Sequence, residues 1–295
     1  MTVTILVILA VSLRIISNPL GNVFQKQLTA EGNHPLFVNF ITYLLLSFIC
    51  LLWAINMEWP ALNRTFWFYS VLAGIAGALG NGFLVKALHR GALSVLGPIN
   101  SYKSIVGIIF GIFLLSEIPN FWGLLGVILV IFGSYFVLDT TEERFSWALL
   151  KNREIRFRIA AMILTAIEAV FIKKIILASS TTIAFMSWCF FGAFFSFILL
   201  LIYRLDLRTG FQDAFRMNHL SRYLLLILCI GTMQFTTNYS FEHIPVGYAL
   251  SLFQLSIILS ILFGYRFFDE KDIGKKILGS LIMIGGSMLI ILLKN

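Results

Sequence analysis

Ten long apolar stretches, separated by short polar breaks, make up most of this chain. They run over 3–25, 36–55, 66–88, 93–115, 120–138, 157–177, 182–203, 222–241, 246–268 and 273–293. Each is about 20 residues long, which is the length of a helix that crosses the hydrocarbon core of a bilayer. Because that core holds no water to satisfy backbone N–H and C=O groups, the crossing segments have to be helical. The sequence therefore predicts an all-α membrane protein with ten transmembrane helices.

The composition supports a membrane protein and excludes a soluble fold. Hydrophobic residues make up 59% of the chain and charged residues 12%, whereas a soluble domain has about 25% charged residues. The net charge of +8 is therefore assigned to loops at one membrane face, and no nucleic-acid partner is expected. Cys50, Cys189 and Cys229 lie within apolar stretches and lack the spacing of a metal site, so we expect neither a metal nor a cofactor.

The two halves of the chain share a sequence pattern. A shift of 147 positions aligns 23–26 (VFQK) with 170–173 (VFIK). A shift of 153 aligns Phe110 with Phe263, Gly111 with Gly264, Glu117 with Glu270, Gly126 with Gly279 and Gly133 with Gly286. Each half holds five spans, and because five is odd, the second half has to be inserted upside down. We predict a first five-helix repeat over 1–138, a solvated linker over 139–156 and an inverted second repeat over 157–295.

The Lys and Arg residues of the loops gather at one face of the predicted bundle. That face carries Lys26, Lys86, Arg90, Arg144, Lys151, Arg153, Arg156, Arg158, Arg204, Arg208, Arg216, Arg222, Arg266, Lys271, Lys275 and Lys276. The opposite face carries only Arg64, Lys173, Lys174 and Lys294. Since basic loops stay in the cytoplasm, the first face is predicted to be cytoplasmic and both termini to lie on the other side.

Three charged residues sit near the middle of predicted spans: Arg14, Lys103 and Glu168. A charge at that depth costs about 2.5–3.5 kcal/mol on insertion scales, so it normally faces a bundle interior or a wet cavity. The three charges sum to one surplus positive charge, which suits a pathway for a polar, anionic solute. An inverted repeat also places a substrate site near the midplane, where its halves meet.

Each of these charges has a structural interpretation beside the functional one. Lys103 and Arg14 can bind a carboxylate or phosphate of a substrate, or they can pair with Glu168 and fix helix packing. Pro19 also frees a backbone carbonyl near Ile15 that Arg14 can bind. Glu168 can carry a coupling proton, but a permanent pair with either cation would keep it ionised. The sequence leaves these alternatives open.

Uncharged polar residues within the spans complete the predicted site. They are Asn18, Asn22, Asn81, Asn100, Tyr102, Asn238 and Gln254. A polar run in mid-membrane has to face protein or water, and Asn100 and Tyr102 flank Lys103 in such a run. Interhelical hydrogen bonding alone explains many buried amides, so contact with substrate is one of two interpretations for each.

The segments 87–117 (ALHRGALSVLGPINSYKSIVGIIFGIFLLSE) and 240–270 (SFEHIPVGYALSLFQLSIILSILFGYRFFDE) carry a family resemblance. Each has a short turn, a long helix with a polar middle and an acid at its end, Glu117 or Glu270. Together with the two five-span halves, they resemble the EamA-like branch of the drug/metabolite transporter superfamily. The acids are expected to complement the N-termini of the helices that follow them. Pro98 and Asn100 have no counterpart in the second segment, so we expect an asymmetric cavity.

The chain lacks the sequence motifs of serine hydrolases, zinc proteases and nucleotide-binding loops. We therefore expect no enzymatic activity and no ATP-driven pumping. The favoured hypothesis is a secondary transporter that moves a small polar, anionic metabolite by alternating access, with a coupling proton or counter-substrate left open. The alternatives are a flippase for a lipid-linked head group and a non-transporting membrane scaffold or sensor subunit. Compact loops favour the bacterial inner membrane.

Overall fold

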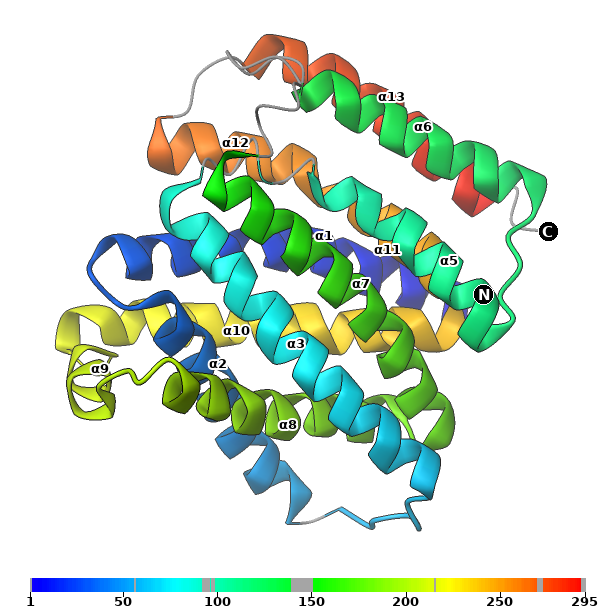
Figure 1. Cartoon of the computed structure of the whole chain (residues 1–295). Coiled ribbons are helices and arrows are strands. Elements are labelled where there is room, and N and C mark those ends of the chain that lie inside the picture. Colours follow the sequence, from blue (N-terminus) through cyan, green and yellow to red (C-terminus); the bar gives the residue numbers. More distant parts are fainter. Residues whose placement is uncertain are drawn as a thin grey trace.

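The protein is a bundle of helices in which α2 and α3 are steeply inclined to α8 and α10 (Figure 1). The computed structural model describes residues 2–55, 57–91, 96, 99–138, 151–214, 216–269 and 273–292. The first half contains α1 (Thr2–Ala30), α2 (Pro35–Ala54), α3 (Arg64–Arg90), the 3-10 turn η1 (Asn100–Tyr102), α5 (Lys103–Leu115) and α6 (Phe121–Leu138). The described part of the chain contains no strand, so the all-α prediction is confirmed there.

The second half repeats this order with one addition. It contains α7 (Arg153–Ala178), α8 (Thr181–Ile202), α9 (Leu207–Ala214), α10 (Met217–His243), α11 (Val246–Phe253), α12 (Ser256–Phe268) and α13 (Ile273–Leu292). The short helix α9 lies in a link that the sequence analysis left without structure. Residues 153–156, assigned to the linker, form the start of α7, and residues 139–150 lie outside the described part.

Within the described part of the chain, six helical segments are long and apolar enough to cross a membrane. They are Val3–Ala30, Pro35–Ala54, Arg64–Arg90, Thr181–Ile202, His219–His243 and Val246–Phe268. Their flanks carry ordinary start signals: Asn63 accepts a hydrogen bond from the Phe66 N–H, and Ser180 accepts one from the Ile183 N–H. These segments support a multi-pass membrane protein, whereas the full number of ten crossings stays a prediction.

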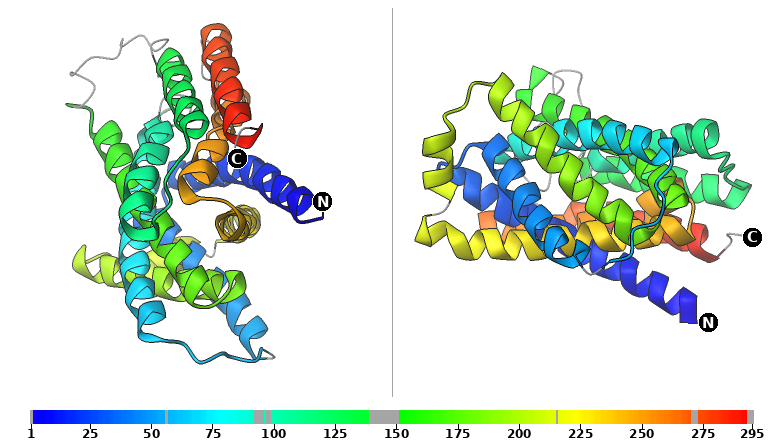
Figure 2. Two further views of the ribbon diagram at one scale, coloured as in Figure 1. Left: turned by 90° about the vertical axis from the view of Figure 1, so that its right-hand side faces the viewer. Right: turned by 90° about the horizontal axis from the view of Figure 1, so that it is seen from below.

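The helices of the two halves pack in a two-fold symmetric way, in which α1 corresponds to α7 and α3 corresponds to α10. Helix α3 packs most extensively on α7, and the corresponding helix α10 packs on α1. Likewise α5 contacts α7 while α12 contacts α1, and the pairs α2–α8 and α6–α13 map onto themselves. Figures 1 and 2 show α6 and α13 side by side at one edge of the bundle. The start of α1 and the end of α13 lie at the same end of the bundle (Figures 1 and 2), as two consecutive five-span units require.

The ends of α5 and α12 show the repeat at the level of single residues. Both helices stop at a residue in the left-handed conformation, Ser116 with φ 57° and Asp269 with φ 52°. In each, a backbone N–H at the cap donates to a glycine carbonyl, that of Gly111 or of Gly264. Since both pairs are 153 residues apart, the structure reproduces the shift found in the sequence.

The fourth and ninth predicted spans are broken helices, whereas the sequence analysis treated each as continuous. The 3-10 turn η1 comes directly before α5, and two residues, Gln254 and Leu255, separate α11 from α12. At the second break the N–H groups of Gln254 and Leu255 donate three residues back, to Ser251 and Leu252. Such interruptions are sustained at membrane depth only where the backbone lies in protein or beside a cavity, and they mark the binding region of many transporters.

Candidate functional site: a polar cavity between the halves

A polar cavity lies between α1, α3, α5, α7, α10 and α11. Its polar walls are Arg14, Asn18, Asn22, Asn81, Asn100, Lys103, Arg158, Thr165, Glu168, Gln234 and Thr237. The remaining wall is apolar and includes Ile172, Phe241 and Phe253. The volume of the cavity that the centre of a water molecule can occupy is about 60 Å³, which is enough for a few water molecules. A metabolite therefore fits only if it is small or if the walls move apart.

The structure brings together all but three of the residues predicted as a site. The predicted residues that line the cavity are Arg14, Asn18, Asn22, Asn81, Asn100, Lys103 and Glu168. They come from both halves of the chain, as an inverted repeat with a midplane site requires. Their contact with a substrate stays a prediction, but their convergence in space is a finding.

Three predicted residues lie away from the cavity walls. Tyr102 packs against a small apolar cluster that includes Val23 and Leu88. Asn238 is fully buried, and its side chain contacts that of Gln234 one turn earlier on α10. Gln254 is also buried at the break between α11 and α12, where its Nε2 donates to the Leu250 carbonyl, 2.9 Å away. In this conformation the three support the walls and do not form them.

Arg14 is buried with its guanidinium only partly satisfied. Its Nε donates to Thr237 Oγ1 at 2.9 Å, and its Cζ lies 4.7 Å from the centre of the Phe253 ring. Its Nη1 is buried without a hydrogen-bond partner. Buried polar groups are normally paired, so a free donor beside a polar cavity marks a place for a ligand oxygen. The alternative bond to a carbonyl freed by Pro19 is not formed.

Lys103 is the first residue of α5, directly after the break in the fourth span. It forms no hydrogen bond and no salt bridge with any described residue, although its charge interacts with Glu168, Arg14 and Arg158. Lys103 therefore presents its positive charge to the cavity without a described acidic partner within salt-bridge distance.

Glu168 is held by aromatic and glycine neighbours. Its Oε1 accepts a 2.7 Å hydrogen bond from Trp188 Nε1. A Cβ at Gly77 would collide with the same oxygen, so the carboxylate occupies space that only glycine leaves open. Among the described residues, no salt bridge joins Glu168 to Arg14 or to Lys103. The interpretation as a permanent ion pair is therefore not realised in this conformation.

Arg158 is a cavity residue that the sequence analysis missed. It was assigned to the basic face as a loop charge, but the structure buries it in the second turn of α7, with 7% of its surface exposed. Its Nε donates to the Leu96 carbonyl at 2.8 Å. Arg156, two residues earlier, is exposed in the ordinary way. Since both lie at the start of a span, their positions in the sequence do not show which of the two is buried.

Glu117 lies at the end of the bundle opposite the basic face, which we call the outer end, and contacts the other half of the chain there. Its Oε2 accepts a 2.8 Å hydrogen bond from the Val246 N–H at the start of α11, and Lys173 Nζ lies 4.0 Å from its Oε1. Lys173 also donates to the Phe241 carbonyl. The sequence analysis assigned Glu117 to the N-terminus of the helix that follows it, whereas it caps a helix of the other half. Its repeat partner Glu270 lies outside the described residues.

This outer contact, made by Glu117, Lys173 and Val246, joins the two halves. Burial raises the pKa of the Glu117 carboxyl, and the Val246 N–H and Lys173 oppose that rise. Protonation would remove the charge that attracts Lys173 and the α11 N-terminus. We therefore expect the contact to weaken as the pH at the outer face falls.

Replacing Glu117 by glutamine is expected to open the outer end. Loss of a charge-assisted contact shifts such an equilibrium about tenfold. The measurement is labelling of Ile172→Cys by a membrane-impermeant thiol reagent added at the outer face, with Cys50, Cys189 and Cys229 replaced by alanine. Glu242→Gln is the matched control, because Glu242 accepts from Thr181 within the second half. Equal labelling in the two variants would show that the outer contact does not close the pathway.

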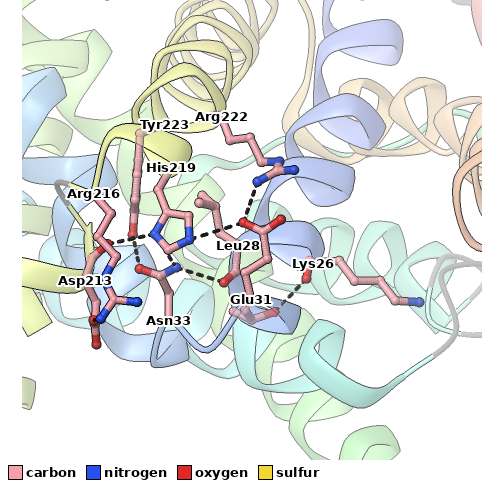
Figure 3. Close-up of polar contacts among 10 residues, drawn as sticks. Lys26, Leu28, Glu31, Asn33, Asp213, Arg216, His219, Arg222 and Tyr223 are labelled. Carbon is pink, nitrogen blue, oxygen red and sulfur yellow. Dashed lines mark hydrogen bonds and ion pairs between the residues drawn. The ribbon is translucent and has the colours of Figure 1, made fainter.

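A second polar cluster links the halves at the basic end (Figure 3). Glu31, after α1, accepts from Arg222 of α10 and lies 3.3 Å from His219 Nε2. Asn33 lies 3.2 Å from His219 Nδ1, which is 2.7 Å from the Asp213 carbonyl oxygen. None of these residues lines the cavity. The cluster therefore fixes the α1–α2 turn to α9 and α10 and forms no part of the candidate site.

Comparisons with known proteins identify the fold. A sequence model of the EamA-like transporter family matches residues 5–139 and 153–292, which are the two halves of the chain. A crystal structure of a protein is similar over 99% of this chain and 97% of its own, with a TM-score of 0.69 and 14% sequence identity. At that identity the likeness shows a shared fold and nothing about substrate. No curated protein matches the sequence.

Proposed function

We propose, because the chain belongs to the EamA-like transporter family, that it is a secondary transporter for a small polar, anionic metabolite. The single observation that carries the anionic assignment is the pair Arg14 and Lys103 in the cavity, since neither has an acidic partner within salt-bridge distance among the described residues. An anionic substrate would supply the partner that the protein does not. The amides of Asn18, Asn81 and Asn100 would orient its uncharged part.

The two-fold architecture supports alternating access. Two inverted halves allow two conformations of similar energy, one open to each side. In the conformation described here, the outer contact is formed and the cavity walls extend to Arg158, near the basic end of α7. We assign this conformation to the state closed at the outer face. Glu168 would adjust the charge of the cavity, or carry a coupling proton, as substrate enters.

Thermal unfolding of the purified protein with a panel of metabolites tests this proposal. A ligand at 100 times its Kd stabilises the folded state by about 2.7 kcal/mol. We expect small anions to stabilise the parent and not the Lys103→Gln variant. Lys174→Gln is the matched control, because Lys174 lies on α7 outside the cavity walls. If Lys103→Gln responds to anions as the parent does, Lys103 binds no substrate.

Uptake into protein-containing lipid vesicles separates solute transport from lipid flipping. A transporter of soluble anions exchanges labelled solute across the vesicle membrane, whereas a flippase moves a labelled head group between leaflets. The polar walls, drawn from both halves of the chain, favour the soluble solute. Absence of solute exchange, together with head-group movement, would replace the proposal by its alternative.

A further inference from the structure

The charges of the cavity are not balanced by the residues that the structure describes around it. Arg14, Lys103 and Arg158 line it with a single carboxylate, that of Glu168. Three cations and one acid leave a formal surplus of two positive charges. They come from α1, α5 and α7, so three separate elements deliver them to one place. Uncompensated charge in a protein interior is costly, which makes a balancing ligand favourable.

Both arginines keep donors that no described residue uses. Arg14 bonds through Nε to Thr237, and its buried Nη1 has no partner. Arg158 bonds through Nε to the Leu96 carbonyl and forms no other hydrogen bond with described residues. Anchoring a guanidinium through Nε leaves the two terminal nitrogens, the pair that binds carboxylate or phosphate oxygens in parallel. Two arginines held in this way face a shared space with Lys103.

We infer that the cavity selects a dianionic group, the chemistry shared by a phosphate monoester and a dicarboxylate, with Arg158 as the residue that sets this preference. The inference rests on the proposed function and narrows its substrate class. A dianion neutralises the surplus, whereas a monoanion leaves one positive charge and a zwitterion leaves two. A phosphate monoester has a charge of about −1.5 to −2 at pH 7, so it meets the requirement with one group.

Arg158 also has a structural interpretation, because its bond to Leu96 holds the chain where the fourth span approaches its break. A purely structural role predicts that its loss weakens all ligands alike. A role in charge recognition predicts that the loss weakens dianions selectively. The ratio of dianion affinity to monoanion affinity therefore distinguishes a structural role of Arg158 from a role in charge recognition. A measurement of overall activity does not distinguish the two.

The experiment measures binding by thermal shift at pH 8 with four probes on the purified full-length chain. Glycerol 3-phosphate and succinate are the dianions, glycerate is the monoanion and glycerol is the neutral control. We expect at least one of the two dianions to bind the parent more tightly than glycerate does. The dianion that binds more tightly shows whether the cavity prefers a phosphate monoester or a dicarboxylate. Arg158→Gln should lose about tenfold or more of dianion affinity and keep that for glycerate.

Two further variants complete the test. Arg156→Gln removes an exposed arginine from the same turn region and should leave the preference unchanged. Arg158→Lys keeps the charge and should retain part of the preference. Equal binding of glycerate and the dianions by the parent, with Lys103→Gln losing both, would overturn the dianion assignment and leave an anion transporter. A parent that responds to no anion would overturn the proposed function as well.

Discussion

Replacing Arg14 by glutamine is expected to weaken anion binding strongly and to make the ligand-free protein more stable. Arg14 is buried with 7% of its surface exposed, and one of its terminal nitrogens has no hydrogen-bond partner. No described acid lies within salt-bridge distance, so its removal leaves no orphaned carboxylate. A buried charge without an acidic partner is costly to the folded state, so its replacement by a neutral side chain is expected to raise the free energy of unfolding. Glutamine can also keep a hydrogen bond to Thr237.

The expected loss of binding is at least about a hundredfold, since a buried guanidinium can contribute two charge-assisted hydrogen bonds. The thermal-shift assay measures both effects on one sample, with and without ligand. Arg266→Gln is the matched control, because Arg266 is exposed in the last turn of α12, and it should change neither quantity. A variant that unfolds at a lower temperature would show that Arg14 is a structural residue, and one that still binds anions would remove it from the site.

The opposite signs of these two effects express a general feature of binding sites. A cavity prepared for an anion holds its donors unpaired until the ligand arrives, and the folded protein is less stable for it. The same logic explains why the sequence alone could locate Arg14, Lys103 and Glu168. A charge in mid-membrane cannot face lipid at reasonable cost, so residues from three distant spans had to converge on one interior.

The sequence could not separate Arg158 from ordinary loop charges, for a related reason. A basic residue near the cytoplasmic end of a span satisfies the rule for membrane topology whether it is exposed or buried. The burial of Arg158 depends on its tertiary contact with the Leu96 carbonyl, which the local sequence does not indicate. Likewise, the Glu117 contact spans 129 residues to Val246, and no local pattern indicates such a partner.

The local sequence indicates only one of the two helix breaks. Pro98 precedes η1, so the fourth span offers a signal for its interruption. The break at Gln254 and Leu255 contains neither Pro nor Gly, and only the two-fold repeat relates it to the first. The sequence repeat therefore predicted that the two halves pack against each other, whereas the break in the ninth span depends on tertiary packing and has no local sequence signal.

Replacing Gly286 or Gly133 by alanine is expected to destabilise the protein by similar amounts, about 1–3 kcal/mol each. A Cβ at Gly286 would lie 2.6 Å from the Gly126 carbonyl oxygen, and one at Gly133 would lie 2.5 Å from that of Gly279. Both obstacles are backbone atoms, which cannot rotate away, so α6 and α13 would have to separate. Small residues allow this close approach of helices within a membrane. The two sites are exchanged by the 153-residue repeat, which is why equal effects are expected.

Gly285→Ala provides the matched control on the same helix. A Cβ at Gly285 meets nothing within 4 Å, and alanine favours a helix over glycine by about 1 kcal/mol, so this variant should be as stable as the parent or more so. Thermal unfolding in detergent compares the three variants. Ligand affinity should be unchanged in all of them, because no cavity wall comes from α6 or α13 in the described structure. Unequal losses at Gly133 and Gly286 would mean that the halves do not meet symmetrically at this edge, and stability equal to that of Gly285→Ala would mean that the two helices do not touch there.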